Sequence, residues 1–347
     1  MSSSRLIERI AVITSGGDAP GMNAALRAVV LAAEHDGIDV VGFRHGYEGL
    51  LNNDYMKLGR DEVEHILQYS GTIIKSARSE RFKTDEGGIE AARNLDAQNV
   101  DAFIVIGGDG SFRGANHLAK FWQGPIIGIP GTIDNDLFGT DNTIGYDTAV
   151  ETAMDALDKI RDTAEAMDRV FIVEVMGRNA GYIAISSAMA SGAERMILPE
   201  LQKDKPLTID ALVKHVEGVN RVRGDSSYVM VLCENQWPGG AVRLAEQLED
   251  RLNFPCRPCL LGHVQRGGRP TAMDRILATR LGVYAVQLVQ EGITGVMAGI
   301  EKNELVTTPL EDTWVKRKVL SQELIDIQTK CFNPIKKDRH KATVDKA

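Results

Sequence analysis

Short apolar segments of strand length alternate along the chain with longer amphipathic segments of helical period. The apolar segments are residues 10–14, 40–43, 102–106, 126–129, 170–175, 228–232 and 259–261. Residues 23–33 follow the first segment with helical spacing, and Asn23 stands where a helix N-cap is expected. Buried strands that alternate with helices are typical of a largely parallel sheet covered on both faces. The pattern therefore predicts an α/β fold.

Three of these strands are followed by glycine-rich loops that carry acids. The loops begin after Thr14, Ile106 and Ile129 and read SGGDAPGMN, GGDGS and PGTIDND. In open α/β sheets, ligands bind beyond the carboxyl ends of the strands. We therefore expect the chemistry of this protein in these three loops.

The first loop resembles a phosphate-binding turn without matching the P-loop motif. Gly16 and Gly21 have the P-loop spacing, but Met22 and Asn23 stand where lysine and serine or threonine are required. Backbone amides in a glycine turn before a helix can bind phosphate without a lysine. The loop is equally consistent with a tight strand-to-helix turn.

The second and third loops favour phosphoryl transfer. The sequence GGDG lets the backbone approach a phosphate, and Asp109 within it can hold Mg²⁺. Several kinase families, including lipid and NAD kinases, use this motif, whereas the chain lacks the GxGxxG of dinucleotide oxidoreductases. In the third loop, one of Asp134 and Asp136 can accept a hydroxyl proton while the other supports a metal.

Length and composition narrow the class of protein. The 347 residues suffice for two domains, and 43% hydrophobic residues support ordinary cores. A net charge of −8 disfavours nucleic-acid binding. We expect neither a signal peptide nor a membrane span, since no apolar run reaches 18 residues. Of the four cysteines, Cys233, Cys256, Cys259 and Cys331, only Cys256 and Cys259 form a CxxC, and it lacks a second pair for a metal site. We therefore expect these two thiols to pack in a strand or at its edge. Thiols fit a reducing compartment, which favours the cytoplasm.

Taken together, the motifs resemble the 6-phosphofructokinase family. The three loops, the triplet MGR at residues 176–178 and GHVQRGG at 262–268 stand in family order along nearly the whole chain. The resemblance implies two doubly wound α/β domains with the active site in the cleft between them. The implied nucleotide domain comprises residues 1–145 and about 265–315. The implied sugar-phosphate domain comprises residues 146–264 and about 316–335, and residues 336–347 form a polar tail.

The resemblance also implies roles for individual residues in transfer from ATP to fructose 6-phosphate. Asp134 is the base for the sugar 1-hydroxyl, with Thr132 beside the transferred group. The implied Mg²⁺ residues are Asp109 and Asp136, and the implied charge-stabilising residues are Arg78 and Arg178. Nucleotide contacts are implied for Gly17, Tyr47, Arg78, Ser79, Gly108, Asp109, Gly110 and Ser111. Substrate contacts are implied for Thr132, Ile133, Asp134, Arg169, Met176, Gly177, Arg178, Glu234, Arg257, His263, Val264, Gln265 and Arg266.

Two further expectations concern assembly and regulation. In the family, the residues that match Arg169 and Arg257 reach in from a neighbouring subunit, which implies a homo-oligomer, expected to be a tetramer. The effector site of bacterial members is matched in part by Arg27, Arg161 and Glu194, and Arg223 is a candidate for one missing basic position. Leu31 and Asp54 stand where arginines are expected, which favours weak or altered regulation.

Alternatives to an ATP-dependent kinase differ in the phosphoryl donor or in activity. Pyrophosphate-using relatives tend to carry an acid at the position of Gly110 and a lysine at that of Gly131. Without side chains there, we expect space at both positions for the α-phosphate and nucleoside of ATP. An NAD or lipid kinase would share GGDG but is not expected to carry GHVQRGG. A non-catalytic paralogue usually lacks a catalytic acid or arginine, and here these residues are all present.

Overall fold

The computed structural model describes residues 6–202, 206–223, 227–252 and 254–332. The chain divides into two compact units. The first unit comprises Met1–Ala149 with His263–Val319, and the second comprises Val150–Gly262 with Leu320–Ala347. The polar tail expected at 336–347 lies outside the described residues.

The first unit is built on a seven-stranded sheet in the order β11-β10-β5-β4-β1-β2-β3. The five inner strands are parallel, and the two edge strands β3 and β11 are antiparallel to their neighbours. The strands are β1 (Arg9–Thr14), β2 (Asp39–Phe43), β3 (Tyr55–Leu58), β4 (Ala102–Gly107), β5 (Ile126–Pro130), β10 (Val296–Glu301) and β11 (Glu304–Pro309). Strands β1 and β4 are almost entirely buried because helices cover both faces.

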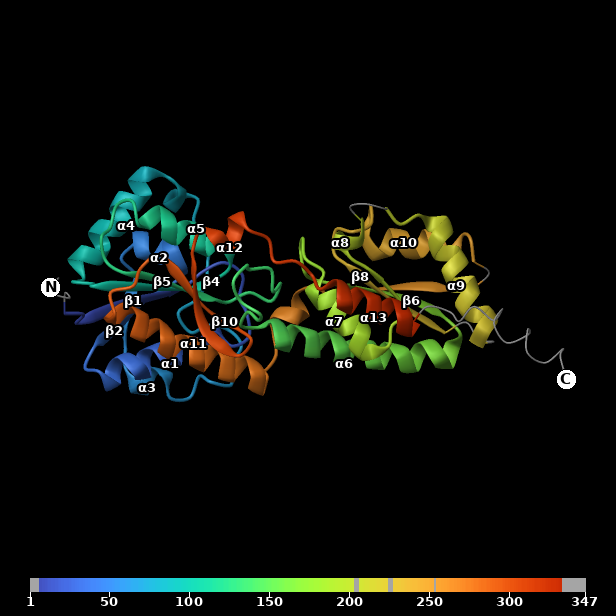
Figure 1. Cartoon of the computed structure of the whole chain (residues 1–347), viewed down its shortest axis with the longest axis horizontal. Coiled ribbons are helices and arrows are strands. Elements are labelled where there is room, and N and C mark those ends of the chain that lie inside the picture. Colours follow the sequence, from blue (N-terminus) through green and yellow to red (C-terminus); the bar gives the residue numbers. More distant parts are fainter. Residues whose placement is uncertain (1–5, 203–205, 224–226, 253, 333–347) are drawn as a thin grey trace. The chain divides into compact units, whose positions relative to one another are not determined.

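Helices form a layer on each face of this sheet (Figure 1). On one face lie α1 (Met22–His35), α3 (Arg60–Val63) and α11 (Ala272–Gln290); on the other lie α2 (Gly46–Leu51), α4 (Asp85–Ala97), α5 (Asp109–Leu118) and α12 (Asp312–Val315). The 3₁₀ turn η1 spans Arg81–Lys83. The largest fully buried side chains of this core include Phe43, Phe103 and Phe112.

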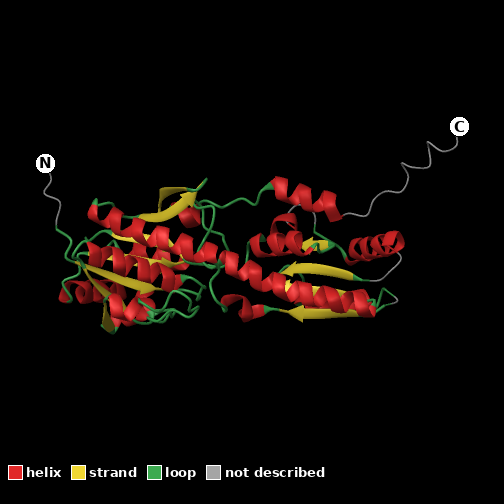
Figure 2. Cartoon of the chain, turned by 90° about the horizontal axis from the view of Figure 1, so that it is seen from below, coloured by secondary structure: helices red, strands yellow, loops and turns green. Residues whose placement is uncertain are grey.

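The second unit has a parallel four-stranded sheet in the order β7-β8-β6-β9. Its strands are β6 (Val170–Val175), β7 (Arg195–Ile197), β8 (Tyr228–Cys233) and β9 (Cys256–Leu260). The helices are α7 (Tyr182–Ser191), α8 (Pro199–Gln202), α9 (Ile209–Arg223), α10 (Gly240–Glu249) and α13 (Gln322–Phe332). The three unit boundaries fall within α6 (Tyr146–Met167), within the 3₁₀ turn η2 (Gly262–Arg266) and between Val319 and Leu320. Figure 2 shows helices on both sides of the strands in each unit.

The expected α/β class with largely parallel sheets is confirmed, with two local corrections. The N-cap of α1 is Gly21 at φ 106°, so the prediction for Asn23 is wrong. Asn23 is instead fully buried, and its side chain binds the backbone of residues 69–73: it donates to the carbonyls of Tyr69 and Gly71 and accepts from the amide of Ile73. Strand β9 begins three residues before the predicted one. Arg257 and Pro258 interrupt its apolar pattern, which an edge strand tolerates.

The topology determines where loops of the first unit converge. From β1 the chain moves outward to β2 and β3, then returns to the other side of β1 to form β4 and β5. The order therefore reverses between β1 and β4, and the loops that leave these strands diverge there. Such a switch point is the usual ligand-binding position in an open α/β sheet.

Candidate active site

The three predicted loops are neighbours at the carboxyl ends of β1, β4 and β5. The amide of Ser15 donates to the carbonyl of Ile106 at 3.0 Å, and the amide of Gly131 donates to the carbonyl of Gly107 at 2.9 Å. A Cβ at Gly107 would lie 2.5 Å from the Ser15 carbonyl oxygen, closer than real contacts allow. Glycine at 107 therefore permits the first two loops to touch.

The second loop continues into the N-terminal turn of α5. Gly108 is the N-cap, and the amides of Ser111 and Phe112 return to its carbonyl at 3.0 and 3.1 Å. The first amides of a helix lack intrahelical partners and carry partial positive charge, which favours bound phosphate. A Cβ at Gly110 would meet no atom within 4 Å, as expected for this position. The turn therefore presents an open, anion-attracting surface.

At Gly131, the space that a side chain would enter is already occupied by neighbouring atoms. A Cβ there would lie 3.0 Å from Met22 Cε and 3.2 Å from Ile106 Cγ2. The expectation of open space at this glycine is therefore wrong. A side chain at Gly131 would require Met22 and Ile106 to shift, whereas Gly110 faces open space.

Tyr47 and Ser79, both expected to contact the nucleotide, are each fixed by a hydrogen bond in the first unit. Tyr47 is buried, stacks on Phe82 with ring centroids 4.1 Å apart, and donates to the Ser111 carbonyl at 2.6 Å. Burial raises the pKa of Tyr47 well above its usual value, so the phenol stays a donor. Ser79 donates to Glu48 at 2.6 Å. Tyr47 thus supports the second loop, Ser79 is bound to α2 through Glu48, and the nearby Arg78 is exposed.

Arg266 lies against the first loop. Its Nη1 donates to the carbonyl of Asp18 at 3.1 Å and would lie 2.6 Å from a Cβ at Gly17. Burial raises the pKa of Asp18, and the charge of Arg266 lowers it in part. Of the other residues expected in GHVQRGG, His263 and Val264 are exposed and Gln265 is buried.

The third loop holds its acids in contrasting surroundings. Asp134 is only 8% exposed, and its amide approaches Thr132 Oγ1 at 3.3 Å. Thr143 supports the loop by donating from Oγ1 to the Thr132 carbonyl at 2.6 Å. Asp136 is partly exposed, and the side chain of Ile133 is fully buried, so a substrate would reach Ile133 through its backbone.

In the second unit, Met176, Gly177 and Arg178 follow the carboxyl end of β6. Gly177 has φ 142°, and a Cβ there would lie 2.5 Å from the Ala180 carbonyl, so this turn requires glycine. The amide of Arg178 donates to Glu234 Oε1 at 2.8 Å, which ties the triplet to the residue after β8. The Arg178 side chain is exposed. The turn and Glu234 therefore form one local cluster.

Arg169 and Arg257 lie at the other end of the same sheet. Val170 pairs with Cys256 and Phe171 with Arg257, so both arginines stand where β6 and β9 begin. Met176 follows Arg169 by seven positions, which correspond to about 23 Å of extended chain. Arg257 donates to Glu249 at 2.7 Å. Within one chain, these arginines are therefore far from the Met176–Arg178 turn.

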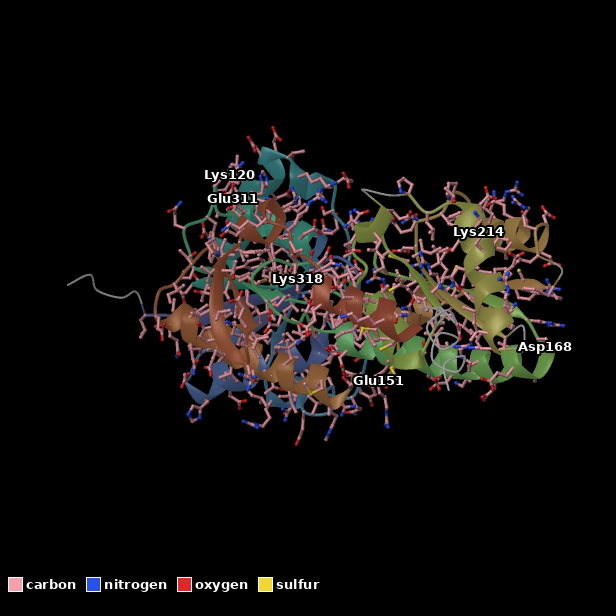
Figure 3. The ribbon with its side chains drawn as sticks, turned by 45° about the vertical axis from the view of Figure 1, so that its right-hand side comes forward. Lys120, Glu151, Asp168, Lys214, Glu311 and Lys318 are labelled. Carbon is pink, nitrogen blue, oxygen red and sulfur yellow. The ribbon has the colours of Figure 1, made fainter. Side chains whose placement is uncertain are left out.

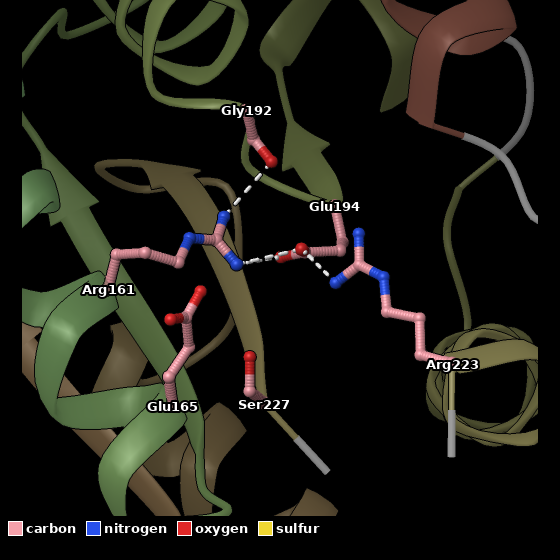
Figure 4. Close-up of a pocket in the computed structure, with 6 residues that line it drawn as sticks. All are labelled: Arg161, Glu165, Gly192, Glu194, Arg223 and Ser227. Atoms are coloured by element: carbon pink, nitrogen blue, oxygen red, sulfur yellow. Dashed lines mark hydrogen bonds and ion pairs between the residues drawn. The ribbon is translucent and has the colours of Figure 1, made fainter. Parts of the chain in front are cut away.

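Of the residues matched to the effector site, Arg161, Glu194 and Arg223 line a cavity of about 420 Å³ in the second unit (Figure 4), whereas Arg27 lies on α1 of the first unit. Glu194, whose side chain is 1% exposed, accepts from Arg161 at 2.7 and 3.0 Å and from Arg223 at 2.5 Å. One carboxylate thus engages both guanidinium groups. In the first unit, Asp54 pairs with Arg44 at 3.0 Å.

Sequence reasoning missed the side chain that contacts the third loop from a distance. Lys318 donates to Asn135 Oδ1 at 2.8 Å and to the Asp141 carbonyl at 2.7 Å. It stands in a polar segment without a motif, so no local signal identifies it. Within the described residues the four cysteines form no disulfide, and Cys256 and Cys259 lie in the edge strand β9, as expected. Over the described ranges, no helix has the length and apolarity needed to cross a membrane.

Comparisons with known proteins agree with these motifs and this topology. The chain is 47% identical over 319 residues to an ATP-dependent 6-phosphofructokinase of Thermus thermophilus, covering 92% of this chain and 98% of that protein. It is 46% identical over 325 residues to the ATP-dependent 6-phosphofructokinase of Cytophaga hutchinsonii, covering 93% and 98%.

Solved structures show the same fold. Phosphofructokinase from Saccharomyces cerevisiae matches with a TM-score of 0.81 at 37% identity, over 88% of this chain and 45% of that longer chain. A pyrophosphate-dependent phosphofructokinase from Marinobacter aquaeolei matches with a TM-score of 0.81 at 23% identity, over 94% and 92%, which shows the fold alone. The phosphofructokinase family model matches residues 9–289. With this match and the 47% identity over nearly the full length of a relative, the chain belongs to the phosphofructokinase family.

Proposed function

We propose that this chain transfers the γ-phosphoryl group of ATP to the 1-hydroxyl of fructose 6-phosphate, yielding ADP and fructose 1,6-bisphosphate. The observation that carries the proposal is the position of the buried Asp134. Asp134 lies in the third loop, which is hydrogen-bonded through the Gly131 amide to Gly107 at the end of β4. Strand β4 leads directly into the open N-terminal turn of α5. A base and a phosphate-attracting turn on neighbouring strands are what phosphoryl transfer requires.

The first unit would supply the donor half of the reaction. The amides at the start of α5 and the exposed Gly17 would bind phosphates, with Gly110 leaving space for the nucleotide. Arg78 is exposed and would stabilise charge that develops on the transferred group. Tyr47 would act by holding Ser111, since its hydroxyl and ring are already engaged.

Asp134 would be the general base. Proton abstraction makes the sugar hydroxyl a better nucleophile, and a positioned base typically contributes ~10²–10⁴-fold. Its buried position limits competition from water. Thr132 would hydrogen-bond beside the transferred group, and Thr143 keeps the Thr132 backbone fixed.

The acids of the site fit Mg²⁺ that arrives with ATP rather than a resident metal. Throughout the described part of the chain, no three His, Cys, Asp or Glu side chains gather into a metal cage. Mg²⁺ in kinases is usually bound by one or two carboxylates together with substrate phosphates and water. Asp109, with its side chain 38% exposed, and the partly exposed Asp136 fit this role. When bound, the cation would screen the negative charge of the phosphates.

The second unit would bind the sugar phosphate. The Met176–Arg178 turn and Glu234 would contact the sugar, and Arg178 would add positive charge near the transferred group. Arg169 and Arg257 would bind the 6-phosphate, because arginine offers charge-assisted, forked hydrogen bonds. The family resemblance assigns the same role to His263 and Arg266, which belong to the first unit.

An active site shared between subunits would explain why Arg169 and Arg257 lie far from the Met176–Arg178 turn of their own chain. Arg169 and Arg257 begin strands whose far ends carry the sugar turn, about 23 Å away along the chain. We therefore propose that both arginines serve the site of a neighbouring subunit in a homo-oligomer, expected to be a tetramer. A cytoplasmic location remains a prediction from the family's role in glycolysis.

Regulation by an anionic effector is expected to be weak. Glu194 already engages Arg161 and Arg223, so a phosphate would have to compete with a buried carboxylate for both. Leu31 and Asp54 supply no cation where the family pattern has arginines. This chain would therefore bind a polyanionic effector less tightly than members with the full set.

A coupled assay tests the proposed function directly. With Mg²⁺ and fructose 6-phosphate, we expect ATP-dependent formation of fructose 1,6-bisphosphate, and Asp134→Ala should lower kcat by ~10²–10⁴-fold. The apparent KM for ATP should change little because ATP does not need that carboxylate. Asp155→Ala, which removes an exposed acid, is the matched control. An inactive wild type, or near-normal kcat in folded Asp134→Ala, would contradict the proposal.

A further inference from the structure

Lys318, labelled in Figure 3, is distant in sequence from the third loop but forms hydrogen bonds with it. It follows α12, and the first unit ends at the next residue, Val319. Its ammonium donates to Asn135 Oδ1 at 2.8 Å and to the Asp141 carbonyl at 2.7 Å. One side chain thus binds both ends of the segment 135–141.

Asn135 is the link between this lysine and the acids. It stands between Asp134 and Asp136, is 3% exposed, and has φ 52°. A residue other than glycine in the left-handed region is unusual, although asparagine is among those that tolerate it. Its side chain also accepts from the Thr143 amide at 3.0 Å and donates to the Asp141 carbonyl at 3.3 Å.

This backbone conformation directs the two acids differently. Asn135, between the two acids, has a positive φ, which changes the direction of the backbone at that point. Asp134 is buried on one side of it, and Asp136 is partly exposed on the other. The side-chain bonds of Asn135 hold that conformation, and the Lys318 bond is the one that carries a full charge. Charge-assisted hydrogen bonds are stronger than neutral ones.

The surroundings of Lys318 show that its ammonium is not a surface charge. Burial lowers its pKa to about 8, and the neighbouring carboxylates of Asp141 and Asp136 oppose this shift. A largely desolvated cation needs hydrogen-bond acceptors and negative charge nearby, and here the catalytic loop provides both. The nearby Arg317, in contrast, is exposed.

We propose that Lys318 is a positioning residue for phosphoryl transfer, which fixes Asn135 so that the acids on either side of it keep their separate directions. The proposal rests on the proposed function, because it assigns Asp134 and Asp136 to catalysis. The alternative is a tether that merely attaches the 316–319 segment to the loop 135–141 within the first unit. A tether affects stability, whereas a positioning residue affects kcat in a folded enzyme.

The test compares three variants of the full-length protein. Lys318→Met removes the charge and the donors at similar length, Lys318→Arg keeps both, and Arg317→Met removes an equal charge one residue away. Because a misplacement of about 1 Å can cost ~10²-fold in rate, we expect Lys318→Met to lower kcat by ~10–100-fold. The KM for ATP should change by less than about threefold, since the α5 turn is untouched. Lys318→Arg should recover much of the rate, and Arg317→Met should match the wild type.

The outcomes separate this proposal from the proposed function. Wild-type kcat in folded Lys318→Met overturns the positioning role while leaving the function intact. A fall in kcat that Arg317→Met reproduces also overturns it, because net charge would then be the cause. A wild type that does not phosphorylate fructose 6-phosphate with ATP overturns both. If Lys318→Met does not fold, Lys318→Gln decides instead: a kcat reduced at least about threefold supports the role, and an unchanged kcat contradicts it.

Discussion

Gly110 allows the choice of phosphoryl donor to be tested with a change that the fold should accept. A Cβ at this position meets no atom within 4 Å, and the residue is the second of α5. Acids in the first turn of a helix are favoured by the helix dipole by about 0.3–1 kcal/mol. Gly110→Asp should therefore leave thermal stability unchanged or slightly raised. Its effect on catalysis is expected to have the opposite sign.

The magnitude follows from charge and distance. A carboxylate at 110 would face the phosphate-binding side of the α5 turn. At about 5 Å from a phosphate charge and an effective dielectric constant of about 20, repulsion costs about 3 kcal/mol. This corresponds to a loss of ~10²-fold or more in kcat/KM for ATP. The side-chain volume adds to this cost wherever it overlaps the α-phosphate.

Two controls separate volume from charge. Gly110→Asn has nearly the shape of aspartate without its charge, and Gly110→Ala adds a single methyl group. We expect kcat/KM for ATP to fall in the order Ala, Asn, Asp, with the largest step between the last two. Each variant and the wild type are assayed with ATP and with pyrophosphate at equal Mg²⁺, and thermal midpoints are recorded in parallel.

Three results would refute this reasoning. The first is Gly110→Asp with kcat/KM for ATP within about threefold of wild type, which would mean that no phosphate approaches position 110. The second is a wild type that uses pyrophosphate as well as ATP. The third is an equal loss in Gly110→Asn and Gly110→Asp, which would assign the effect to volume and refute the like-charge argument.

The remaining predictions concern the assembly and the stability of the first unit. Reassorted oligomers of Asp134→Ala and Arg257→Ala should regain partial activity because some sites would then be intact; no recovery after confirmed subunit exchange would contradict site sharing. Asp274 accepts from the amides of Gly145 and Thr148 at 2.8 Å and from the Thr148 hydroxyl. Asp274→Ala would leave these buried donors without an acceptor and should lower the free energy of unfolding by about 2–5 kcal/mol. The change is measured as a lower thermal midpoint at fixed protein concentration, with Asp274→Asn expected to be intermediate. An unchanged midpoint would contradict this prediction.

Local sequence determined the strands and the loops after them. The apolar segment 102–106 is a buried strand, and GGDG at its end opens a helix, because strand length, glycine and an acidic first turn are all local properties. The grouping of the three loops also followed from the sequence. Parallel strands must deliver their carboxyl ends to one edge of a sheet, whichever of them are neighbours.

Tertiary structure decided the features that depend on distant partners. Asn23 is a residue type favoured at N-caps, yet its side chain forms hydrogen bonds with the backbone of residues 69–73. Gly131 is packed against the side chain of Met22. No local pattern specifies either neighbour. The local sequence does not distinguish an asparagine that caps a helix from one that is buried, or a glycine in open space from one that is closely packed. The distinction depends on neighbours that only the folded chain supplies.

The same reason separates the two kinds of site residue. Asp134 was identified because its loop carries both acids and its own turn-forming residues. Lys318 was not, because 183 positions separate it from Asn135 and its segment has no motif. The position of Arg169 and Arg257 where β6 and β9 begin, at the opposite end of the sheet from the Met176–Arg178 turn, likewise appears once strand direction and register are known. Sequence alone thus determined which chemistry the chain can perform. The packing of distant segments decided which groups support each acid, because those contacts depend on the path of the whole chain.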